Sequence, residues 1–263
     1  MKNLNSMLEW YPLIEKVVST PKTVMIPLQE IEDLDTFISP AYDNEVKNTE
    51  MKRLVDKAEK ASQSLGGYPI FLRSDQTSNK HDWNNTCYVT NNQSLAAAIA
   101  RIFEFSLMVD IGFKAVILRE FLTLPHEFHA FNGMPVSKEF RFFIKNGEVQ
   151  CRHPYWFPSC MRRVDDNNWL PKLRKLQELD PTTQNLLDEI SMKVSKAVES
   201  LQTPNNYWSI DFCYAEKIGW LVTDMAIGED SYHYGTCPNA NPMFLKRYGD
   251  PEDIKNVTIK KTK

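Results

Sequence analysis

The stretch Tyr207–Asp224, YWSIDFCYAEKIGWLVTD, has the pattern of a β-hairpin. Two runs rich in aromatic and β-branched residues flank Glu216–Gly219, which has the character of a turn. If the loop is centred between the middle two residues of that turn, Asp211 lies opposite Asp224 on the partner strand. Asp211 also points away from the apolar face formed by its two neighbours, because side chains alternate along a strand.

Two carboxylates that face each other across a hairpin repel, and a bound cation relieves this repulsion. Mg²⁺ suits such a site, since it binds through one or two carboxylates together with the phosphates of a substrate. Asp211 and Asp224 therefore predict a magnesium site. The alternatives are an exposed hairpin whose aspartates lie in water, or a register shifted by one residue.

The composition bounds the class of protein. A chain of 263 residues is long enough for one large domain or two smaller ones with a sizeable core. A net charge of −3 gives no global basic field that attracts nucleic acid, although a local basic patch stays open. No apolar run reaches the length of a membrane span, and the N-terminus lacks a signal-peptide core. We therefore expect a cytoplasmic protein without membrane association.

The five cysteines are odd in number and widely scattered, so they form neither a disulfide framework nor a paired zinc spacing. This favours a reduced protein. Cys151, His153 and Cys160 together suggest a metal site, but we expect structural thiols there.

A pair of cations lies around a predicted strand-loop-strand unit. Tyr68–Asp75 has the pattern of a strand that ends in charge, and Thr86–Val89 of the returning strand. Arg73 lies at the end of the first strand and Lys80 in a polar loop that we expect to be mobile. A planar guanidinium and a movable ammonium together suit a polyphosphate. The alternative is two unrelated surface cations.

A helix capped by Asn92 is predicted to run to about Asp110. The strand Lys114–Leu122 that follows is apolar in its middle, which indicates an interior position in a sheet. Its end, Arg119–Leu122, resembles a linker that would offer backbone donors and acceptors to a flat ring.

The run Lys138–Lys145 alternates, so that Glu139 and Arg141 project together from one face. Asn146-Gly147 is a strong turn signal, and Glu148–His153 is the predicted returning strand. The glutamate and arginine form either a surface ion pair or part of a ligand site, and the pattern leaves both open.

The remaining segments carry fewer functional signals. The sequence predicts a helix broken near Pro12, a strand at Thr23–Pro27, and helices at Ile31–Ile38, Asn44–Leu65, Pro171–Leu179 and Thr182–Leu201. The loop Tyr155–Arg163 is either a substrate wall or a buried aromatic cluster. No Walker-type glycine loop, dinucleotide fingerprint or GxSxG elbow occurs, which argues against P-loop NTPases and serine hydrolases.

The order of these features resembles the ATP-grasp superfamily. Within it, Leu118-Arg-Glu-Phe-Leu122 and Glu139-Phe-Arg-Phe-Phe-Ile144 look most like the cell-division-cycle protein 123 type. They are also similar to the compact phage and bacterial group named for two arginines and a lysine. The resemblance runs from about Tyr68 to Tyr234. It implies an α+β fold of two lobes with antiparallel sheets that enclose an ATP cleft. The implied parts are an N-terminal region 1–67, a small lobe 68–122, a large lobe 123–240 with a helical insertion, and a tail 241–263.

The resemblance also implies roles for individual residues. Arg73 and Lys80 look like the cations that hold the ATP phosphates. Glu120, Phe121 and Leu122 look like the adenine-binding hinge, in which Glu120 accepts from the adenine amino group. The ribose hydroxyls fall to Glu127 or Glu139, and this choice stays open. Arg141 looks like a phosphate or acyl-phosphate contact, and Asp211 and Asp224 look like the Mg²⁺ ligands.

One departure concerns Asp224-Met-Ala226, since the superfamily usually has an asparagine at the third position. The missing oxygen would come from Glu229 or Asp230, or a second metal ion would be bound weakly. The resemblance thus implies an ATP-dependent ligase that joins a small-molecule or peptide carboxylate to an amine. The alternatives are an ATP-binding assembly factor or chaperone with a protein partner, and a nucleic-acid-modifying enzyme, which the negative charge disfavours.

Overall fold

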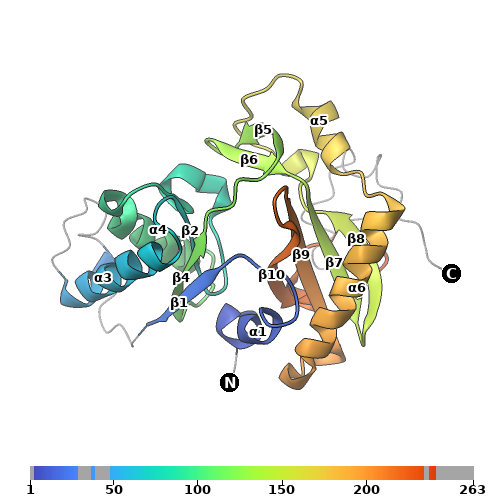
Figure 1. Cartoon of the computed structure of the whole chain (residues 1–263), viewed down its shortest axis with the longest axis horizontal. Coiled ribbons are helices and arrows are strands. Elements are labelled where there is room, and N and C mark those ends of the chain that lie inside the picture. Colours follow the sequence, from blue (N-terminus) through green and yellow to red (C-terminus); the bar gives the residue numbers. More distant parts are fainter. Residues whose placement is uncertain (1–2, 29–36, 39–47, 234–236, 241–263) are drawn as a thin grey trace.

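The computed structural model describes residues 3–28, 37–38, 48–233 and 237–240. Within these ranges the chain forms helices and antiparallel sheets, so the predicted α+β class is confirmed. Two four-stranded sheets stand on either side of the molecule, and a two-stranded sheet lies at the top of the view in Figure 1. None of the described helices is long and apolar enough to cross a membrane.

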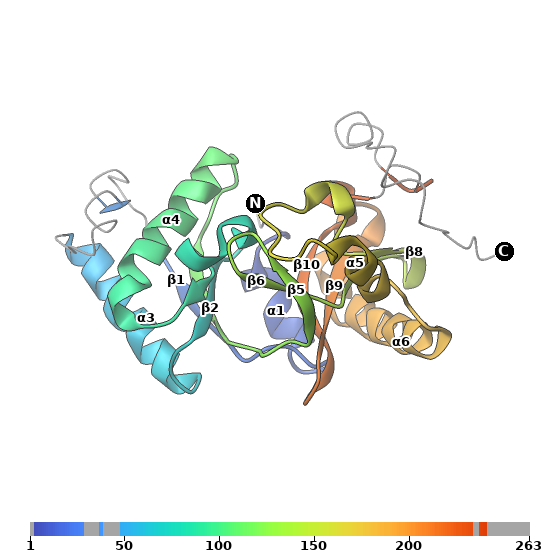
Figure 2. The ribbon, with the colours of Figure 1, turned by 90° about the horizontal axis from the view of Figure 1, so that it is seen from above.

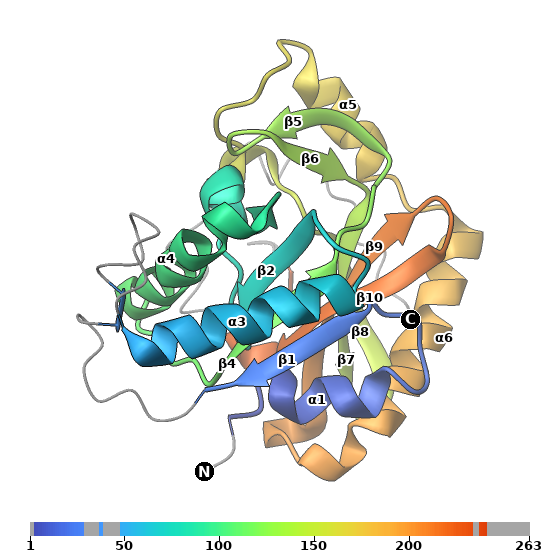
Figure 3. The same cartoon turned by 60° about the vertical axis from the view of Figure 1, so that its left-hand side comes forward.

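The first sheet has the strand order β1-β4-β2-β3 and is antiparallel. Its strands are β1 (Thr23–Pro27), β2 (Ile70–Ser74), β3 (Tyr88–Val89) and β4 (Ala115–Glu120). β4 lies inside the sheet, as its apolar run predicts. Helices α3 (Thr49–Ser64) and α4 (Leu95–Met108) share a core with one face of this sheet, and α3 crosses in front of it in Figure 3.

The second sheet has the order β10-β9-β7-β8. Its strands are β7 (Glu139–Lys145), β8 (Glu148–Pro154), β9 (Tyr207–Ala215) and β10 (Gly219–Ile227). One face carries an apolar layer, which shares a core with helices α1 (Met7–Ile14) and α6 (Pro181–Ala197). The opposite face carries Glu139, Arg141 and Asp211 and is turned toward the first sheet, because side chains alternate along each strand.

A smaller unit lies between the two large sheets when the molecule is seen from above (Figure 2). It consists of the hairpin β5 (His126–Ala130) and β6 (Met134–Ser137), against which helix α5 (Trp169–Leu176) packs. Its core also includes Trp83 from the connection between β2 and β3, and Phe121 from the end of β4 packs against it. This unit therefore joins the first sheet to the second.

The hairpin of β9 and β10 pairs Asp211 with Asp224, as predicted, but for a different reason. Near the turn, Ala215 pairs with Gly219, so the loop alone would place Asp211 opposite Thr223. A β-bulge at Thr223 adds one residue to β10 and brings the two aspartates opposite each other.

The predicted break near Pro12 is wrong, because α1 runs through this residue. A proline inside a helix removes one intrahelical hydrogen bond. In this short helix, the fully buried side chains of Met7, Trp10 and Ile14 hold the same backbone against the core. Packing therefore outweighs the local preference of the proline.

Two further predictions need correction. Asn92 does not cap α4 but begins a 3₁₀ helix, Asn92–Ser94, which is capped by the Asn91 side chain accepting from the Ser94 N–H, and α4 follows with Ser94 at its N-cap. Lys80 does not lie in an irregular loop but begins a 3₁₀ helix, Lys80–Asn85. Most of the predicted helix Ile31–Ile38 lies outside the described residues, as do the beginning of the predicted helix at 44–65 and the tail.

Gly228 lies where a side chain has no room, because an added Cβ would be 2.4 Å from the ring of Tyr207. We expect Gly228→Ala to lower the free energy of unfolding by about 1–3 kcal/mol, since the ring or the backbone must move. Thermal unfolding followed by circular dichroism measures the change. Gly112→Ala is the control, because the nearest atom to its added Cβ is 4.0 Å away. Equal unfolding temperatures for the two variants would contradict the prediction.

Candidate functional site

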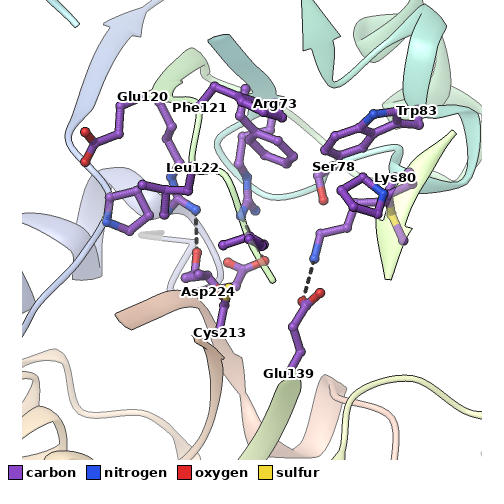
Figure 4. Close-up of a pocket in the computed structure, with 17 residues that line it drawn as sticks. Arg73, Ser78, Lys80, Trp83, Glu120, Phe121, Leu122, Glu139, Cys213 and Asp224 are labelled. Atoms are coloured by element: carbon purple, nitrogen blue, oxygen red, sulfur yellow. Dashed lines mark hydrogen bonds and ion pairs between the residues drawn. The ribbon is translucent and has the colours of Figure 1, made fainter. Parts of the chain in front are cut away.

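A pocket lies between the two large sheets and is lined by residues of both (Figure 4). The first sheet and its connections contribute three cations, Arg73, Lys80 and Arg119. The second sheet contributes the carboxylates of Glu139 and Asp224. The apolar part of the lining includes Pro21, Phe71, Trp83, Phe121, Leu122, Leu124, Met134 and Pro135. The pocket therefore combines apolar surface with a concentrated set of charges.

Arg73 and Arg119 are two buried cations on the same face of the first sheet. Arg119 pairs with Phe71, two residues before Arg73, so the two arginines share one face of neighbouring strands. Arg73 Nη1 lies 2.9 Å from Asp224 Oδ2, and Arg119 Nη1 donates to the carbonyl of Thr223. These contacts reach across the pocket to β10.

The two guanidinium groups are only partly satisfied. Arg73 Nη2 and Arg119 Nε are buried and have no hydrogen-bond partner in the part of the chain that the structure describes. Burial, together with the neighbouring charge of Arg73, lowers the pKa of Arg119 to about 9. A buried donor without an acceptor is costly, so the pair suits an anion that accepts from both groups.

The two aspartates predicted to bind Mg²⁺ lie side by side on β9 and β10. Arg141 forms a bidentate ion pair with Asp211, in which Nε donates to Oδ1 at 2.7 Å and Nη2 donates to Oδ2 at 2.8 Å. Asp224 pairs with Arg73. Burial raises the pKa of Asp211, and the Arg141 guanidinium opposes this shift. Each carboxylate is balanced by a cation and retains lone pairs for a further ligand.

Lys80 lies at the centre of the site. Its Nζ is 3.3 Å from Glu139 Oε2 (Figure 4) and 4.6 Å from the ring centroid of Tyr155. Burial alone would lower the pKa of Lys80, but the carboxylate of Glu139 and other acidic groups nearby raise it, so the amine stays charged. Glu139 is itself held by Trp156 Nε1 at 2.9 Å and Ser137 Oγ at 3.3 Å.

The predicted adenine-binding segment Glu120–Leu122 borders the pocket. The carboxylate of Glu120 does not face the charged groups, as Figure 4 shows. It accepts instead from the backbone N–H of Lys22 at 2.7 Å. Phe121 packs against Tyr88, with ring centroids 4.9 Å apart. The side chain of Glu120 therefore anchors the start of β1, and the backbone of the segment is the part available to a ligand.

The two glutamates predicted for the ribose lie in different places. Glu139 lines the pocket. Glu127 lies on β5 outside it, and its Oε1 is 3.0 Å from Lys175 Nζ on α5. Of the two glutamates, only Glu139 lines the pocket that also holds Arg73, Lys80 and Arg119.

A second pocket, of about 470 Å³, continues from Lys80 on the side of Arg141. Tyr155 and Trp156 line it, and the Arg141 guanidinium lies 5.1 Å from the Tyr155 ring. Trp156 also belongs to the buried aromatic core of the small unit. The buried aromatic cluster predicted for this loop is confirmed. The same aromatic residues line the second pocket, and their role as a substrate wall stays a prediction.

Ala226 brings no oxygen to the site, and the two proposed replacements differ in position. Asp230 lines the second pocket, where Asn5 Nδ2 donates to it at 2.9 Å. Glu229 lines neither of these pockets and accepts from Asn205 at 2.9 Å. Asp230 is thus the better placed of the two.

Arg119 belongs to the charged set but was not among the site residues predicted from the sequence. Its signal was present, because a cation in a strand that is otherwise apolar from Ala115 to Leu118 needs a polar partner. Whether Arg119 lies on the same face of the sheet as Arg73 depends on the register between β2 and β4. This register is fixed only in the folded sheet.

Residues 64–244 match the profile of the ATP-grasp domain, R2K clade family 3. Among curated proteins, no sequence matches significantly. The fold is similar to C-terminally truncated Cdc123 from Schizosaccharomyces pombe, with 14% identity, a TM-score of 0.50, and coverage of 84% of this chain and 82% of that chain.

Two enzymes have similar folds. VanG D-Ala:D-Ser ligase from Enterococcus faecalis has 14% identity, a TM-score of 0.51, and coverage of 90% of this chain and 56% of that chain. N5-carboxyaminoimidazole synthase from Aspergillus clavatus, in complex with ADP and 5-aminoimidazole ribonucleotide, has 11% identity, a TM-score of 0.50, and coverage of 95% and 54%. The chain thus spans little more than half the length of both enzymes, and at these identities the likeness concerns the fold alone.

The profile match covers more than half of the chain and includes the cations, the carboxylates and most strands of both large sheets. The chain therefore belongs to the ATP-grasp domain family, in R2K clade family 3.

Proposed function

We propose that the protein is an ATP-dependent ligase that joins a carboxylate to an amine through an acyl-phosphate. The observation that carries this proposal is the pair of buried guanidinium donors on Arg73 and Arg119 that lack acceptors among the described residues. They lie on one side of a pocket whose other side holds Asp224, paired in the sheet with Asp211. A phosphate chain together with a divalent cation satisfies both sides at once.

In this proposal the triphosphate of ATP lies against Arg73, Arg119 and Lys80. The adenine ring lies on the apolar lining and bonds to the backbone of Glu120–Leu122. Glu139, which lines the same pocket, takes the ribose hydroxyls when Lys80 turns toward the phosphates. The presence of both apolar surface and cations in one pocket supports this proposal, because a nucleotide has one flat apolar end and one anionic end.

Asp211 and Asp224 fit Mg²⁺, because they are hard oxygen donors placed opposite each other on neighbouring strands. Mg²⁺ held there would neutralise the charge of the phosphates during transfer. Arg141 and Arg73, which now balance the two carboxylates, would then be free to bind phosphate oxygens. Asp230, which lines the second pocket, is the proposed source of the oxygen that Ala226 lacks.

The reaction has two steps. An oxygen of the substrate carboxylate forms a bond to the γ-phosphorus of ATP, the bond to the β–γ bridging oxygen breaks, and ADP leaves. The nitrogen of the amine then attacks the acyl carbon, loses a proton, and inorganic phosphate leaves. The side chains contribute position and charge, so no nucleophilic residue is needed.

The second pocket is the proposed site of the carboxylate and amine substrates. Arg141 suits the carboxylate or the acyl-phosphate, and Tyr155 and Trp156 offer flat apolar surface. Its volume of about 470 Å³ lies within the usual range for small-molecule sites. A small molecule or a short peptide is therefore the proposed substrate class.

An ATP-binding assembly factor with a protein partner is the second candidate, as the resemblance to the cell-division-cycle protein 123 type implies. One observation favours it. Ala226 stands where the superfamily has an oxygen ligand, which would weaken catalysis more than nucleotide binding.

The release of ADP separates these functions. A ligase should form ADP and phosphate in the presence of Mg²⁺ when amino acids or peptides are supplied as both carboxylate and amine, and the joined product should appear by mass spectrometry. Tight binding of ATP without turnover across such a panel would favour the assembly factor. Absence of nucleotide binding would contradict both.

Lys80→Met should weaken ATP binding about 10- to 100-fold, because it removes one charge-assisted contact to phosphate. Isothermal titration with a non-hydrolysable ATP analogue measures the dissociation constant. Lys175→Met is a matched control, since Lys175 also pairs with a glutamate, Glu127, but lines neither pocket of the site. Unchanged affinity in Lys80→Met would remove this lysine from the phosphate site.

A further inference from the structure

Four buried metal-binding side chains meet on the second sheet, outside the two pockets described above. Cys151, His153, His233 and Cys237 each offer one ligand atom, and these atoms all lie within 4.8 Å of one another. The four residues are between 1% and 4% exposed. Thiol and imidazole side chains are the groups that bind zinc in proteins, so two of each in one cluster suggest a metal site.

Two short segments supply the four groups. Cys151 and His153 lie two residues apart on β8, so their side chains share one face of the strand. They pair with Phe143 and Arg141 of β7, so this is the face that carries the proposed catalytic residues. His233 and Cys237 come from the chain after β10. From the sequence, Cys151 and His153 suggest a metal site together with Cys160, and structural thiols are expected there, whereas the structure brings His233 and Cys237 to them in place of Cys160.

The surroundings of His233 fit a metal ligand. Its ring stacks on Phe143, with centroids 3.5 Å apart and an interplanar angle of 22°. Nδ1 lies 3.1 Å from the carbonyl oxygen of Ser231, which can only accept, so Nδ1 carries the proton. Nε2 then keeps its lone pair, which faces the Tyr207 hydroxyl at 2.8 Å. A ligating histidine is typically fixed by such a bond from its other nitrogen to a backbone carbonyl.

We propose that Cys151, His153, His233 and Cys237 bind one structural Zn²⁺. Two thiolates and two imidazoles are a common ligand set for tetrahedral zinc, and four protein ligands leave no open position for catalysis. The thiol protons are released on binding, and the Nε2 lone pair of His233 passes from the Tyr207 hydroxyl to the metal. A disulfide between the two cysteines would use only half of the set and leave two imidazoles buried beside it.

The site would fasten the chain after β10 to the edge strand β8. Asp230 and Tyr232, which line the second pocket, lie just before His233 on this segment. Phe157, which lines the same pocket, contacts Tyr232, with ring centroids 5.1 Å apart. Zinc would therefore stabilise one wall of the proposed substrate pocket without touching the substrate.

Metal analysis of the full chain, purified with zinc supplied and under reducing conditions, tests this proposal. We expect one zinc per chain in the wild type, and loss of zinc in Cys237→Ser and His153→Ala. Cys160→Ser should keep its zinc, since Cys160 is near in sequence but outside the cluster. Asp224→Asn should also keep it, which separates this site from the proposed magnesium site.

Two measurements on the wild-type protein test the proposal even if the variants fail to fold. X-ray absorption should show two sulfur ligands at about 2.3 Å and two nitrogen ligands at about 2.0 Å from zinc. Removal of zinc by a chelator should lower the unfolding temperature, and added Zn²⁺ should restore it. A wild type that neither contains zinc nor takes it up after reduction overturns the proposal, as does a Cys151–Cys237 disulfide that persists in reductant. Neither result bears on ATP binding, so this proposal and the proposed function fail separately.

Discussion

Asp224→Asn should reduce ADP formation about 100- to 1000-fold, the range seen when one preorganised electrostatic contact to a transition state is removed. Asparagine has the size of aspartate and still offers an oxygen to Arg73, so the fold should survive. The change removes a negative charge from the pair with Asp211 and so weakens the proposed hold on Mg²⁺. A coupled ADP assay over a range of Mg²⁺ concentrations measures the effect, which higher Mg²⁺ should partly reverse.

A matched control exists for this variant. Asp188 on α6 is also held by an arginine, Arg152, at 2.7 and 2.6 Å, but it lines neither pocket of the site. Asp188→Asn should therefore leave ADP formation unchanged. If Asp224→Asn formed ADP at the wild-type rate at every Mg²⁺ concentration, the hairpin aspartates would not be the metal ligands.

Arg119→Met should weaken ATP binding about 10- to 100-fold, while thermal stability is kept or raised. Loss of a charged donor to phosphate accounts for the affinity. The variant loses the hydrogen bond to the Thr223 carbonyl, but it also removes a buried cation with an unsatisfied Nε and its repulsion with Arg73, and these gains offset the loss. Methionine keeps much of the apolar stem that packs in the sheet. Titration with an ATP analogue and thermal unfolding of the same preparation give the two values.

This test is specific, because ATP affinity is expected to fall while thermal stability does not. A residue with a merely structural role would lose stability and affinity together. Arg174→Met serves as a control for the loss of a positive charge, since Arg174 is exposed on α5 and lines neither pocket. An Arg119→Met variant that binds ATP normally would mean that the orphaned donors do not bind phosphate.

Local patterns in the sequence predicted much of this fold. The apolar run of β4, the alternation of β7 and the turn at Asn146-Gly147 each report a strand or its end, and all three are confirmed. These signals suffice because burial of a whole strand face depends on the residues of that strand. The fold class and the resemblance to the ATP-grasp superfamily are confirmed as well.

What could not be predicted depends on pairing between distant segments. Arg119 joins Arg73 only through the register of two strands that are far apart in the chain. The carboxylate of Glu120 turns to Lys22, on the approach to β1, which no pattern near Glu120 reveals. Likewise, Cys151 and Cys237 show no recognisable spacing, yet the sheet brings them together. The proposed roles of the site residues stay predictions.

The bulge at Thr223 has a consequence for the contact between the two large sheets. An extra residue in β10 leaves a backbone carbonyl outside the regular ladder, and Arg119 of the first sheet donates to this carbonyl. The contact ties β4 of the first sheet to β10 of the second across the pocket. In the proposed function, phosphate would compete with this carbonyl for the same guanidinium, so binding of the nucleotide would exchange a contact between the sheets for a contact to the ligand.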